Sequence, residues 1–247
     1  MSAEFTVGRC FGVGVGPGDP ELITVRALKA VQGAPVVAFF AAANAVGNAR
    51  QVVDGYLLPS QTEMRLQYPV TTETLSDGES YECIMSAFYH RSADLVAAHL
   101  DAGRDVAVLC EGDPFFYGSF MYIHNRLAER YPVEVIPGVP AMLAAAAVLG
   151  TPLVCLNEVI SVLSGVLPAD ELEHRMRAAD AVIVMKLGRN LAKVRSAVER
   201  AGLLERAHYV ERATMTTQRV MALADADPFT APYFSMVVIP SATAGLR

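Results

Sequence analysis

The chain has 247 residues, and its composition is typical of a folded globular protein rather than a disordered one. Hydrophobic residues make up 53% of it and charged residues 19%, with a formal net charge of −6. This balance excludes the basic surface expected of a protein that binds nucleic acid or an anionic membrane. Nearly all of the positive charge is guanidinium, because Lys29, Lys186 and Lys193 are the chain's only lysines. Arginine suits polyanionic ligands, but on composition alone arginine codon preference in a GC-rich genome is the better explanation of the bias.

The cysteine pattern predicts neither a metal site nor a disulfide framework. The four cysteines are Cys10, Cys83, Cys110 and Cys155. They are widely spaced, without a C-x-x-C pair, so we expect reduced thiols in the cytoplasm. No signal peptide is expected at the N-terminus. Residues 135–157 carry no ionised side chain, but their prolines and glycines predict a turn, a short buried helix and another turn rather than a membrane span.

Strand and helix patterns alternate through the first half of the chain. Buried strands are predicted at residues 10–15, 35–40 and 105–110, and helices at 19–32, 48–56, 79–100 and 119–130. The helix at residue 19 has an N-cap residue followed by proline and an acid, the usual order at a helix start. This alternation favours a mostly parallel sheet.

The second half closes on a run of strands. Strands are predicted at residues 133–136, 159–163, 181–185, 208–212, 218–223 and 234–239, and helices at 141–149, 170–178 and 190–201. We therefore expect two α/β domains, residues 1–131 with a mostly parallel sheet and residues 132–247 with a mixed sheet.

A glycine-rich segment, residues 12–19, follows the first strand and invites a nucleotide-binding interpretation. In each possible register the last glycine of G-x-G-x-x-G is missing, and no Gly-Lys-Ser/Thr is present. Asp19 and Glu21 also place negative charge at the helix start, where a phosphate would otherwise bind. The segment predicts no phosphate site, and it fits a simple tight turn as well as close approach by a bulky ligand.

Two later segments carry more specific signals. Residues 111–118, Glu-Gly-Asp-Pro-Phe-Phe-Tyr-Gly, follow a buried strand at the end where open α/β sheets bind their ligands. Residues 135–141, Val-Ile-Pro-Gly-Val-Pro-Ala, lead from a strand into a helix of small residues. A capped turn with an aromatic core residue would explain the glycine, aspartate and proline of the first segment, but not the whole cluster.

Together the three segments resemble the tetrapyrrole methylases, also called corrin/porphyrin methyltransferases. Residues 14–24 match the family pattern G-x-G-x-G-D-P-x-L-(L/I)-T, residues 112–118 match G-D-P-x-x-Y-G, and residues 135–139 match V-I-P-G-V. The matches occur in the family's order and cover essentially the whole chain. The resemblance implies a two-domain fold that binds S-adenosylmethionine between the domains, mostly through backbone groups.

Within the family, the resemblance is strongest to the branch that methylates precorrin-2 at its C20 meso carbon in cobalamin biosynthesis. The segments that carry it are residues 47–50, 68–73, 110–122 and 232–235. One position departs from the uroporphyrinogen methylases, which have an acidic residue and then arginine after the second strand. This chain has Phe40 and Ala41 there, so the proton-transfer role proposed for that acid has no counterpart here.

The family's functional positions can be placed on this chain by motif. The resemblance implies cofactor contacts at Pro17, Glu111, Gly112, Asp113, Phe116, Pro140, Ala141, Met185 and Ala213, the last standing where the family usually has glycine. It implies that the turn at Gly18 faces the tetrapyrrole, with Gly16 and Asp19 as substrate residues. Arg50 joins them as a candidate partner for substrate carboxylates. Met185 ends a buried strand and would also fit a plain core role.

The implied reaction needs alignment more than a nucleophilic side chain, because a sulfonium methyl group is already activated. The methylated meso carbon must then lose a proton. Asp19, Glu111, Tyr117 and His90 could accept it, but each also fits a capping, surface or core role, and the residues alone select none. No metal is expected.

Other activities remain open on the sequence alone. The substrate could carry cobalt, as cobalt-factor II does, and another tetrapyrrole could be methylated. Relatives of this fold modify ribosomal RNA or the protein residue diphthamide, although the acidic net charge weakens the RNA alternative. A carrier would bind tetrapyrrole or S-adenosylmethionine without turnover. The family implies a homodimer that acts on a small molecule, without nucleic acid or membrane partners.

Overall fold

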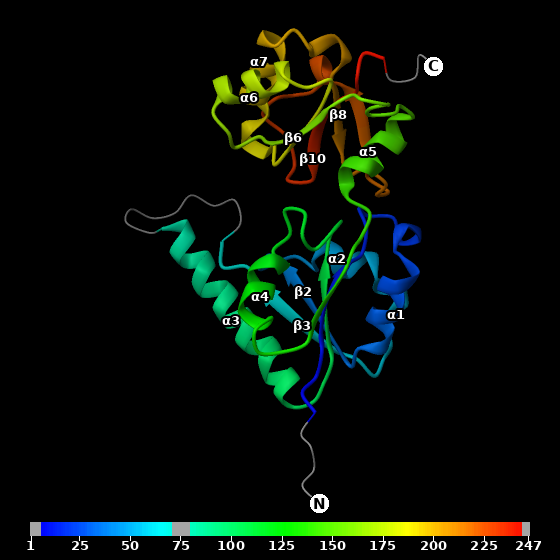
Figure 1. Ribbon diagram of the computed structural model, residues 1–247, viewed down its shortest axis with the longest axis vertical. Helices are drawn as coiled ribbons and strands as arrows, with labels where there is room; N and C mark the ends of the chain where they lie inside the picture. Colours follow the sequence, from blue (N-terminus) through cyan, green and yellow to red (C-terminus); the bar gives the residue numbers. More distant parts are fainter. Residues whose placement is uncertain (1–5, 71–79, 244–247) are drawn as a thin grey trace, which may run out of the picture. The chain divides into compact units, whose positions relative to one another are not determined.

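The computed structural model describes residues 6–70 and 80–243 of the chain. It divides into two compact units, Met1–Pro140 and Ala141–Arg247, each with its own sheet and covering helices (Figure 1). The boundary expected after residue 131 falls earlier than this division. The difference arises because strand β5 (Val133–Ile136) pairs with the first strand of the chain and so completes the first sheet.

The first sheet is parallel throughout, with strand order β3-β2-β4-β1-β5. Its other strands are β1 (Cys10–Gly14), β2 (Val36–Ala41), β3 (Thr62–Gln67) and β4 (Val106–Cys110). The register places Gly14 opposite Cys110, so the two central strands end side by side. The residues that follow each strand therefore gather at one carboxyl edge of the sheet.

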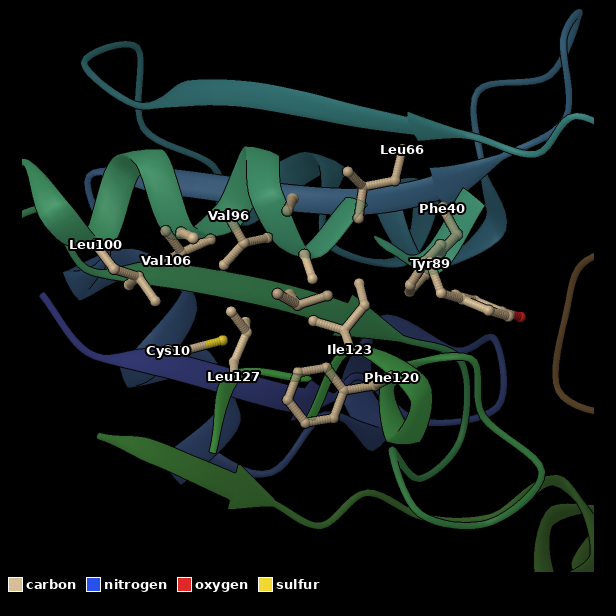
Figure 2. Close-up of a cluster of buried hydrophobic side chains, with 14 of the residues drawn as sticks. Cys10, Phe40, Leu66, Tyr89, Val96, Leu100, Val106, Phe120, Ile123 and Leu127 are labelled. Carbon is tan, nitrogen blue, oxygen red and sulfur yellow. The ribbon is translucent and has the colours of Figure 1, made fainter. Parts of the chain in front are cut away.

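Helices cover both faces of this sheet. Helices α3 (Tyr81–Asp101) and α4 (Phe120–Leu127) lie on one face, and α1 (Val25–Gly33) and α2 (Asn48–Val52) on the other (Figure 1). Side chains alternate along β2, with Phe40 packed toward α3 and Phe39 toward α1 and α2. Figure 2 shows the first of these cores, with Phe40 and Tyr89 near the carboxyl ends of the strands.

Two predicted helices of this unit differ in the structure, and one strand was not predicted. The helix expected over residues 48–56 ends as an α-helix at Val52 and is followed by a 3₁₀ helix over Asp54–Tyr56. The helix expected over residues 19–32 is broken into a short 3₁₀ helix, η1 (Pro20–Leu22), and α1. Ile23 between them is extended, and the Thr24 hydroxyl caps α1 by accepting from the Ala27 N–H at 3.1 Å. Strand β3 was not predicted, because its charged residues obscure the alternation that buries Leu66.

The second unit has a mixed sheet, which confirms the predicted fold class. Its strand order is β6-β7-β10-β8-β9, with β6 and β7 parallel and the remaining pairs antiparallel. The strands are β6 (Ile160–Ser164), β7 (Ala181–Met185), β8 (His208–Glu211), β9 (Arg219–Ala222) and β10 (Ser235–Ile239). Helix α5 (Ala141–Leu149) packs on one face, and α6 (Ala169–Arg177) and α7 (Leu191–Arg200) on the other. The remaining 3₁₀ helices are η2 (Asp54–Tyr56), η3 (Gly188–Asn190), η4 (Leu204–Arg206) and η5 (Leu223–Asp225).

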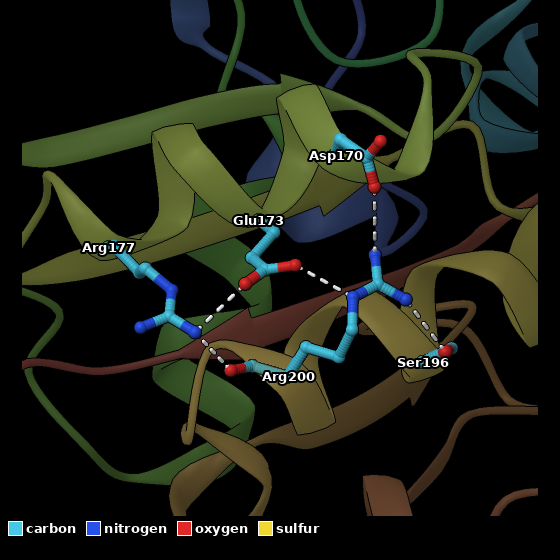
Figure 3. A network of polar contacts seen from close by, with 5 residues as sticks. All are labelled: Asp170, Glu173, Arg177, Ser196 and Arg200. Atoms are coloured by element: carbon cyan, nitrogen blue, oxygen red, sulfur yellow. Dashed lines mark hydrogen bonds and ion pairs between the residues drawn. The ribbon is translucent and has the colours of Figure 1, made fainter.

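A polar network joins α6 to α7 on the outside of this unit (Figure 3). Glu173 accepts from Arg177 at 2.8 Å and from Arg200 at 2.7 Å. Arg200 also donates to the Ser196 hydroxyl at 3.1 Å and lies 3.7 Å from Asp170. Exposed pairs of this kind each stabilise a protein by at most about 1 kcal/mol, so the network aligns the helices without dominating their packing.

Within residues 6–70 and 80–243, every helix is either too short or too polar to span a lipid bilayer. The apolar stretch at residues 135–157 contains the end of β5 and all of α5, with irregular backbone at residues 137–140 between them.

Candidate functional site

The first glycine-rich turn is tied directly to the second. After β1, Gly16 adopts a positive φ of 84° and forms an isolated bridge with Gly112. The Gly112 N–H donates to the Gly16 carbonyl oxygen at 2.8 Å, and the Val15 N–H donates to the Cys110 carbonyl oxygen at 3.0 Å. Pro17 follows and is buried. Two segments almost a hundred residues apart in the sequence are thus held side by side.

The third segment meets the other two at the same point. A Cβ atom on Gly138 would lie 2.1 Å from the Gly112 carbonyl oxygen, and one on Gly14 would lie 2.5 Å from the Gly138 nitrogen. Side-chain carbon atoms cannot approach backbone so closely. These glycines are therefore required by contact between the three segments, at the carboxyl edge where parallel sheets bind ligands.

Asp113 fastens the second segment to the third. Its Oδ2 accepts from the Gly138 N–H at 3.1 Å, and its Oδ1 accepts from the Phe115 N–H at 2.9 Å. Both oxygens are thus used by backbone groups. Asp113 shapes the turn, and its carboxylate is engaged within it.

Glu111 lies between the end of β4 and the start of α2. Its Oε1 accepts from the Ala49 N–H at 3.3 Å, so it caps a helix whose own N-cap residue, Gly47, has no side chain. Burial raises the pKa of the Glu111 carboxyl above its usual value, against the opposing effect of backbone N–H donors.

Asp19 has a clear local role. Its Oδ1 accepts from the Glu21 N–H at 2.9 Å and caps η1. It stands beside the buried Gly16–Pro17 turn, so the structure does bring Asp19 together with the other residues of the first segment.

The structure does not bring Arg50 to this edge. Its guanidinium is paired with Glu63, at the beginning of β3, and donates to Asp54 at 2.6 Å. The register sets Glu63 opposite Val37, near the amino end of the sheet. The Arg50 side chain is 14% exposed and already neutralised by two carboxylates. Its predicted role toward substrate carboxylates has no geometric support in this arrangement.

Arg65 is a basic residue at the carboxyl edge that the sequence reasoning missed. It lies on β3 opposite Phe39, and its Nη2 donates to the carbonyl oxygens of Ala42 and Ala43, just after β2 ends. The alternation of Met64 and Leu66 toward the core was the signal that could have placed it on the other face of a strand.

Three side-chain hydroxyl groups meet where the second segment ends. The Ser119 Oγ is 2.7 Å from the Tyr68 hydroxyl and 3.0 Å from the Tyr89 hydroxyl. The Tyr68 ring stacks on Phe40, with centroids 5.5 Å apart. The position that is acidic in the uroporphyrinogen methylases is thus part of an aromatic core here. Residues 71–73 of the branch segment lie outside the described residues.

Unusual backbone conformations accompany the predicted contacts. Within the described residues, positive φ occurs at five non-glycine positions: Tyr117, Leu156, Lys186, Arg212 and Thr214. Such conformations are uncommon and persist where the surrounding structure enforces them, often at binding sites. Four of the five lie beside a predicted contact: Tyr117 follows Phe116, Lys186 follows Met185, and Arg212 and Thr214 flank Ala213.

In the second unit, a buried carboxylate lies close to Ala213 in the sequence. Glu211 is 4% exposed and accepts from the Tyr209 hydroxyl at 2.9 Å, with Arg212 and Arg219 each 3.4 Å away. Ala213 is buried and does not itself adopt positive φ, so alanine fits where the family usually has glycine.

The other predicted contacts are partly buried and stand at element ends. Pro140 precedes α5, Ala141 begins it, and Met185 ends β7 and packs with the α5 core. Among the described residues no group of three or more histidine, cysteine, aspartate or glutamate side chains could hold a metal ion. The converged turns of the first unit thus consist of close-packed glycines, hydrogen-bonded backbone and a few carboxylates.

Comparison with known proteins links this geometry to one family. The model of the Tetrapyrrole (Corrin/Porphyrin) Methylases matches residues 9–226. A precorrin-2 C(20)-methyltransferase from Sinorhizobium sp is 52% identical over 234 residues, covering 95% of this chain and 96% of that protein. A cobalt-precorrin-2 C(20)-methyltransferase from Salmonella typhimurium is 27% identical, covering 94% of this chain and 96% of that protein.

A solved structure shares the fold. The uroporphyrin-III C-methyl transferase of Thermus thermophilus, complexed with S-adenosylhomocysteine, matches with a TM-score of 0.64 and 24% identity. The match covers 94% of this chain and 97% of that one.

Proposed function

Because the chain belongs to the tetrapyrrole (corrin/porphyrin) methylases, we propose that it methylates precorrin-2 at the C20 meso carbon, giving precorrin-3A in cobalamin biosynthesis. S-Adenosylmethionine is the methyl donor. The observation that carries the proposal is the 52% identity to a precorrin-2 C(20)-methyltransferase, because it extends over nearly the full length of both chains. The lower identity, 27%, to a cobalt-precorrin-2 enzyme favours the metal-free substrate.

The cofactor is proposed to contact the converged turns of the first unit. Gly112 and Phe116 lie in the turn that Asp113 holds in place by accepting from the Phe115 and Gly138 N–H groups. Pro17 stands beside them, because Gly16 is bridged to Gly112. The remaining proposed contacts are Glu111, Pro140, Ala141, Met185 and Ala213. S-Adenosylhomocysteine in the Thermus thermophilus structure supports a cofactor of this class.

The chain's part in the reaction is alignment. A bound sulfonium supplies an activated methyl group, and fixed geometry between it and the attacking carbon can contribute about 7–11 kcal/mol to lowering the barrier. The turns are suited to this task because glycine contacts and Asp113 leave their backbone little freedom.

For the substrate's carboxylates, Arg65 is a better placed partner than Arg50. Arg65 lies at the carboxyl edge of the first sheet, and its described contacts are to carbonyl oxygens, which leave its charge uncompensated. Arginine binds carboxylates through paired N–H groups. Gly16 and Asp19 are proposed to face the tetrapyrrole from the first turn.

The proposed location, oligomeric state and substrate class are inferred from the family and the composition. We place the enzyme in the cytoplasm as a homodimer that acts on a small molecule. The net charge of −6 argues against a nucleic-acid substrate.

The decisive experiment incubates the protein with S-adenosylmethionine labelled with ¹³C in its methyl group and with precorrin-2, without oxygen. NMR should place the label on C20, with one S-adenosylhomocysteine released per methyl group. Parallel reactions use cobalt-loaded substrate and ribosomal RNA. Faster turnover of the cobalt form would move the assignment to the cobalt substrate. Ligand binding without S-adenosylhomocysteine release would identify a carrier and refute the proposal.

A further inference from the structure

In the second unit, two arginines share a single carboxylate, and the inference drawn from them rests on the proposed function. Arg212 and Arg219 both lie against Glu211, the buried residue that ends β8. The Arg212 Nη1 is 3.4 Å from the Glu211 Oε2, and the Arg219 Nη1 is 3.4 Å from the Oε1. Two guanidinium charges thus meet one carboxylate charge, and the group as a whole is positive.

The contacts with Glu211 leave most of the hydrogen-bonding capacity of the two guanidinium groups unused. Each arginine reaches Glu211 with one terminal nitrogen, at a distance that is long for a hydrogen bond. The shorter bond to Glu211, at 2.9 Å, comes from the Tyr209 hydroxyl. The side chains of Arg212 and Arg219 are 37% and 60% exposed. Their planar forks of N–H donors are therefore accessible to an anion from solution.

The strand pairing places these arginines at the edge of the second sheet where the proposed cofactor contacts stand. Strands β7 and β8 each pair antiparallel with β10, so they run in the same direction and end at the same edge. Met185 ends β7, and Glu211 ends β8 two residues before Ala213. Arg219 begins β9 directly opposite Glu211. Both arginines thus flank a segment that contains a proposed cofactor contact.

The arginines meet Glu211 on the other face of the sheet from Ala213. Val210 and Ala213 belong to the core that packs against α5, whereas Tyr209 belongs to the core beneath α6 and α7. Side chains alternate along a strand, so Glu211 points to the same face as Tyr209. The guanidinium groups therefore lie beside the proposed cofactor contacts without being among them. This position favours the tetrapyrrole over the cofactor as their ligand.

We propose that Arg212 and Arg219 together bind a carboxylate group of the tetrapyrrole substrate. Arginine binds carboxylates through paired N–H groups, and two arginines that share one buried carboxylate retain a charge to offer to a second. Glu211 holds the guanidinium groups near one another before the substrate arrives, which reduces the side-chain entropy lost on binding. The alternative is a purely structural role, in which the arginines only neutralise Glu211.

Arg219→Gln tests the proposal, because Arg212 and the Tyr209 hydroxyl still neutralise and contact Glu211 in the variant. Initial rates should show the KM for precorrin-2 raised about tenfold or more, the usual effect of losing a hydrogen bond between charged groups. The values of kcat and of the KM for S-adenosylmethionine should stay within about twofold, since the lost contact is made equally in the ground and transition states. A structural role would change stability without this split.

Arg219→Lys keeps the charge and removes the fork, so its KM for precorrin-2 should lie between those of wild type and Arg219→Gln. Arg175→Gln is the matched control. It removes the same charge from α6, where Arg175 pairs with Glu171, and should leave both KM values at wild-type levels. Added salt should reduce the difference between wild type and Arg219→Gln, because it screens exposed charges.

Calorimetric binding of S-adenosylhomocysteine provides a readout that does not depend on turnover, and its Kd should be unchanged in Arg219→Gln. A weaker Kd with an unchanged KM for precorrin-2 would assign the arginines to the cofactor and overturn the proposal. Wild-type values of both would overturn it as well. If Arg219→Gln does not fold, Arg212→Gln is judged by the same measurements. A wild-type protein that binds precorrin-2 without methylating it would refute the proposed function, and the Kd of precorrin-2 in wild type and variant would then test the arginine pair.

Discussion

At the scale of single residues, this site depends on positions where only glycine fits as much as on particular side chains. Gly14 and Gly138 matter because any side chain there would collide with backbone of another segment. Arg50 shows the opposite case. It was expected to bind substrate because it lies in a family segment. Its guanidinium instead pairs with Asp54 and Glu63. A residue's motif position therefore did not decide where its side chain points.

Arg50→Ala should lower stability more than it affects substrate binding. Removing the guanidinium leaves Glu63 and Asp54 without their partner, which we expect to cost about 1 kcal/mol of unfolding free energy. Urea unfolding measures this loss, and initial rates give KM for precorrin-2. Arg65→Ala is the comparison, with the larger rise in KM expected there. A raised precorrin-2 KM in Arg50→Ala, with stability unchanged, would restore the original prediction.

At the scale of elements, short side-chain contacts decide where chain segments begin and end. Thr24 stops a helix from running continuously from residue 19, and Glu111 caps a helix from another part of the sequence. In the second unit, Glu158 fastens the segment after β10 to the loop before β6. It accepts from the Ser241 hydroxyl at 2.6 Å, from the Thr243 hydroxyl, and from the Cys155 N–H at 2.7 Å.

This last contact predicts a pH-dependent contribution to stability. The hydroxyl of Ser241, then that of Thr243 and the Cys155 N–H, lower the pKa of Glu158 from 4.5 to about 2. Because the folded-state value is the lower one, the stabilisation is present above pH 4.5 and is lost as the pH falls toward 2. The difference in unfolding free energy between wild type and Glu158→Gln should therefore shrink across this range.

Glu205→Gln, which changes an exposed carboxylate of η4, is the control for this experiment. Its difference from wild type should stay nearly constant with pH. A Glu158→Gln difference that is equally flat would show that the contact does not hold in solution.

At the scale of the whole molecule, the chain consists of two units with separate cores and differently built sheets. Proposed cofactor contacts occur in the sequence of both. A ligand that binds the folded chain and not the unfolded chain must stabilise the fold by mass action, whatever the details of its contacts.

S-Adenosylhomocysteine should accordingly raise the unfolding free energy by about 2.7 kcal/mol at a concentration of 100 times its Kd. Calorimetric titration gives the Kd, and thermal unfolding at several ligand concentrations gives the shift. Homocysteine at equal concentrations should have no effect, since it lacks the adenosine. Absence of a shift at concentrations that saturate methyl transfer would contradict the proposed cofactor site.

The sequence by itself determined the elements with strong patterns and the three segments that identify the family. Short apolar runs predicted the buried strands, since a strand covered on both faces consists mostly of apolar residues. The register of the first sheet, the contact of Gly138 with Gly14 and Gly112, and the pairing of Arg50 away from the carboxyl edge were decided by tertiary structure. They depend on which distant segments become neighbours, and local pattern carries no information about that. Strand β3 was also settled by its pairing with β2, because its charged residues obscure the weak alternation of Met64 and Leu66.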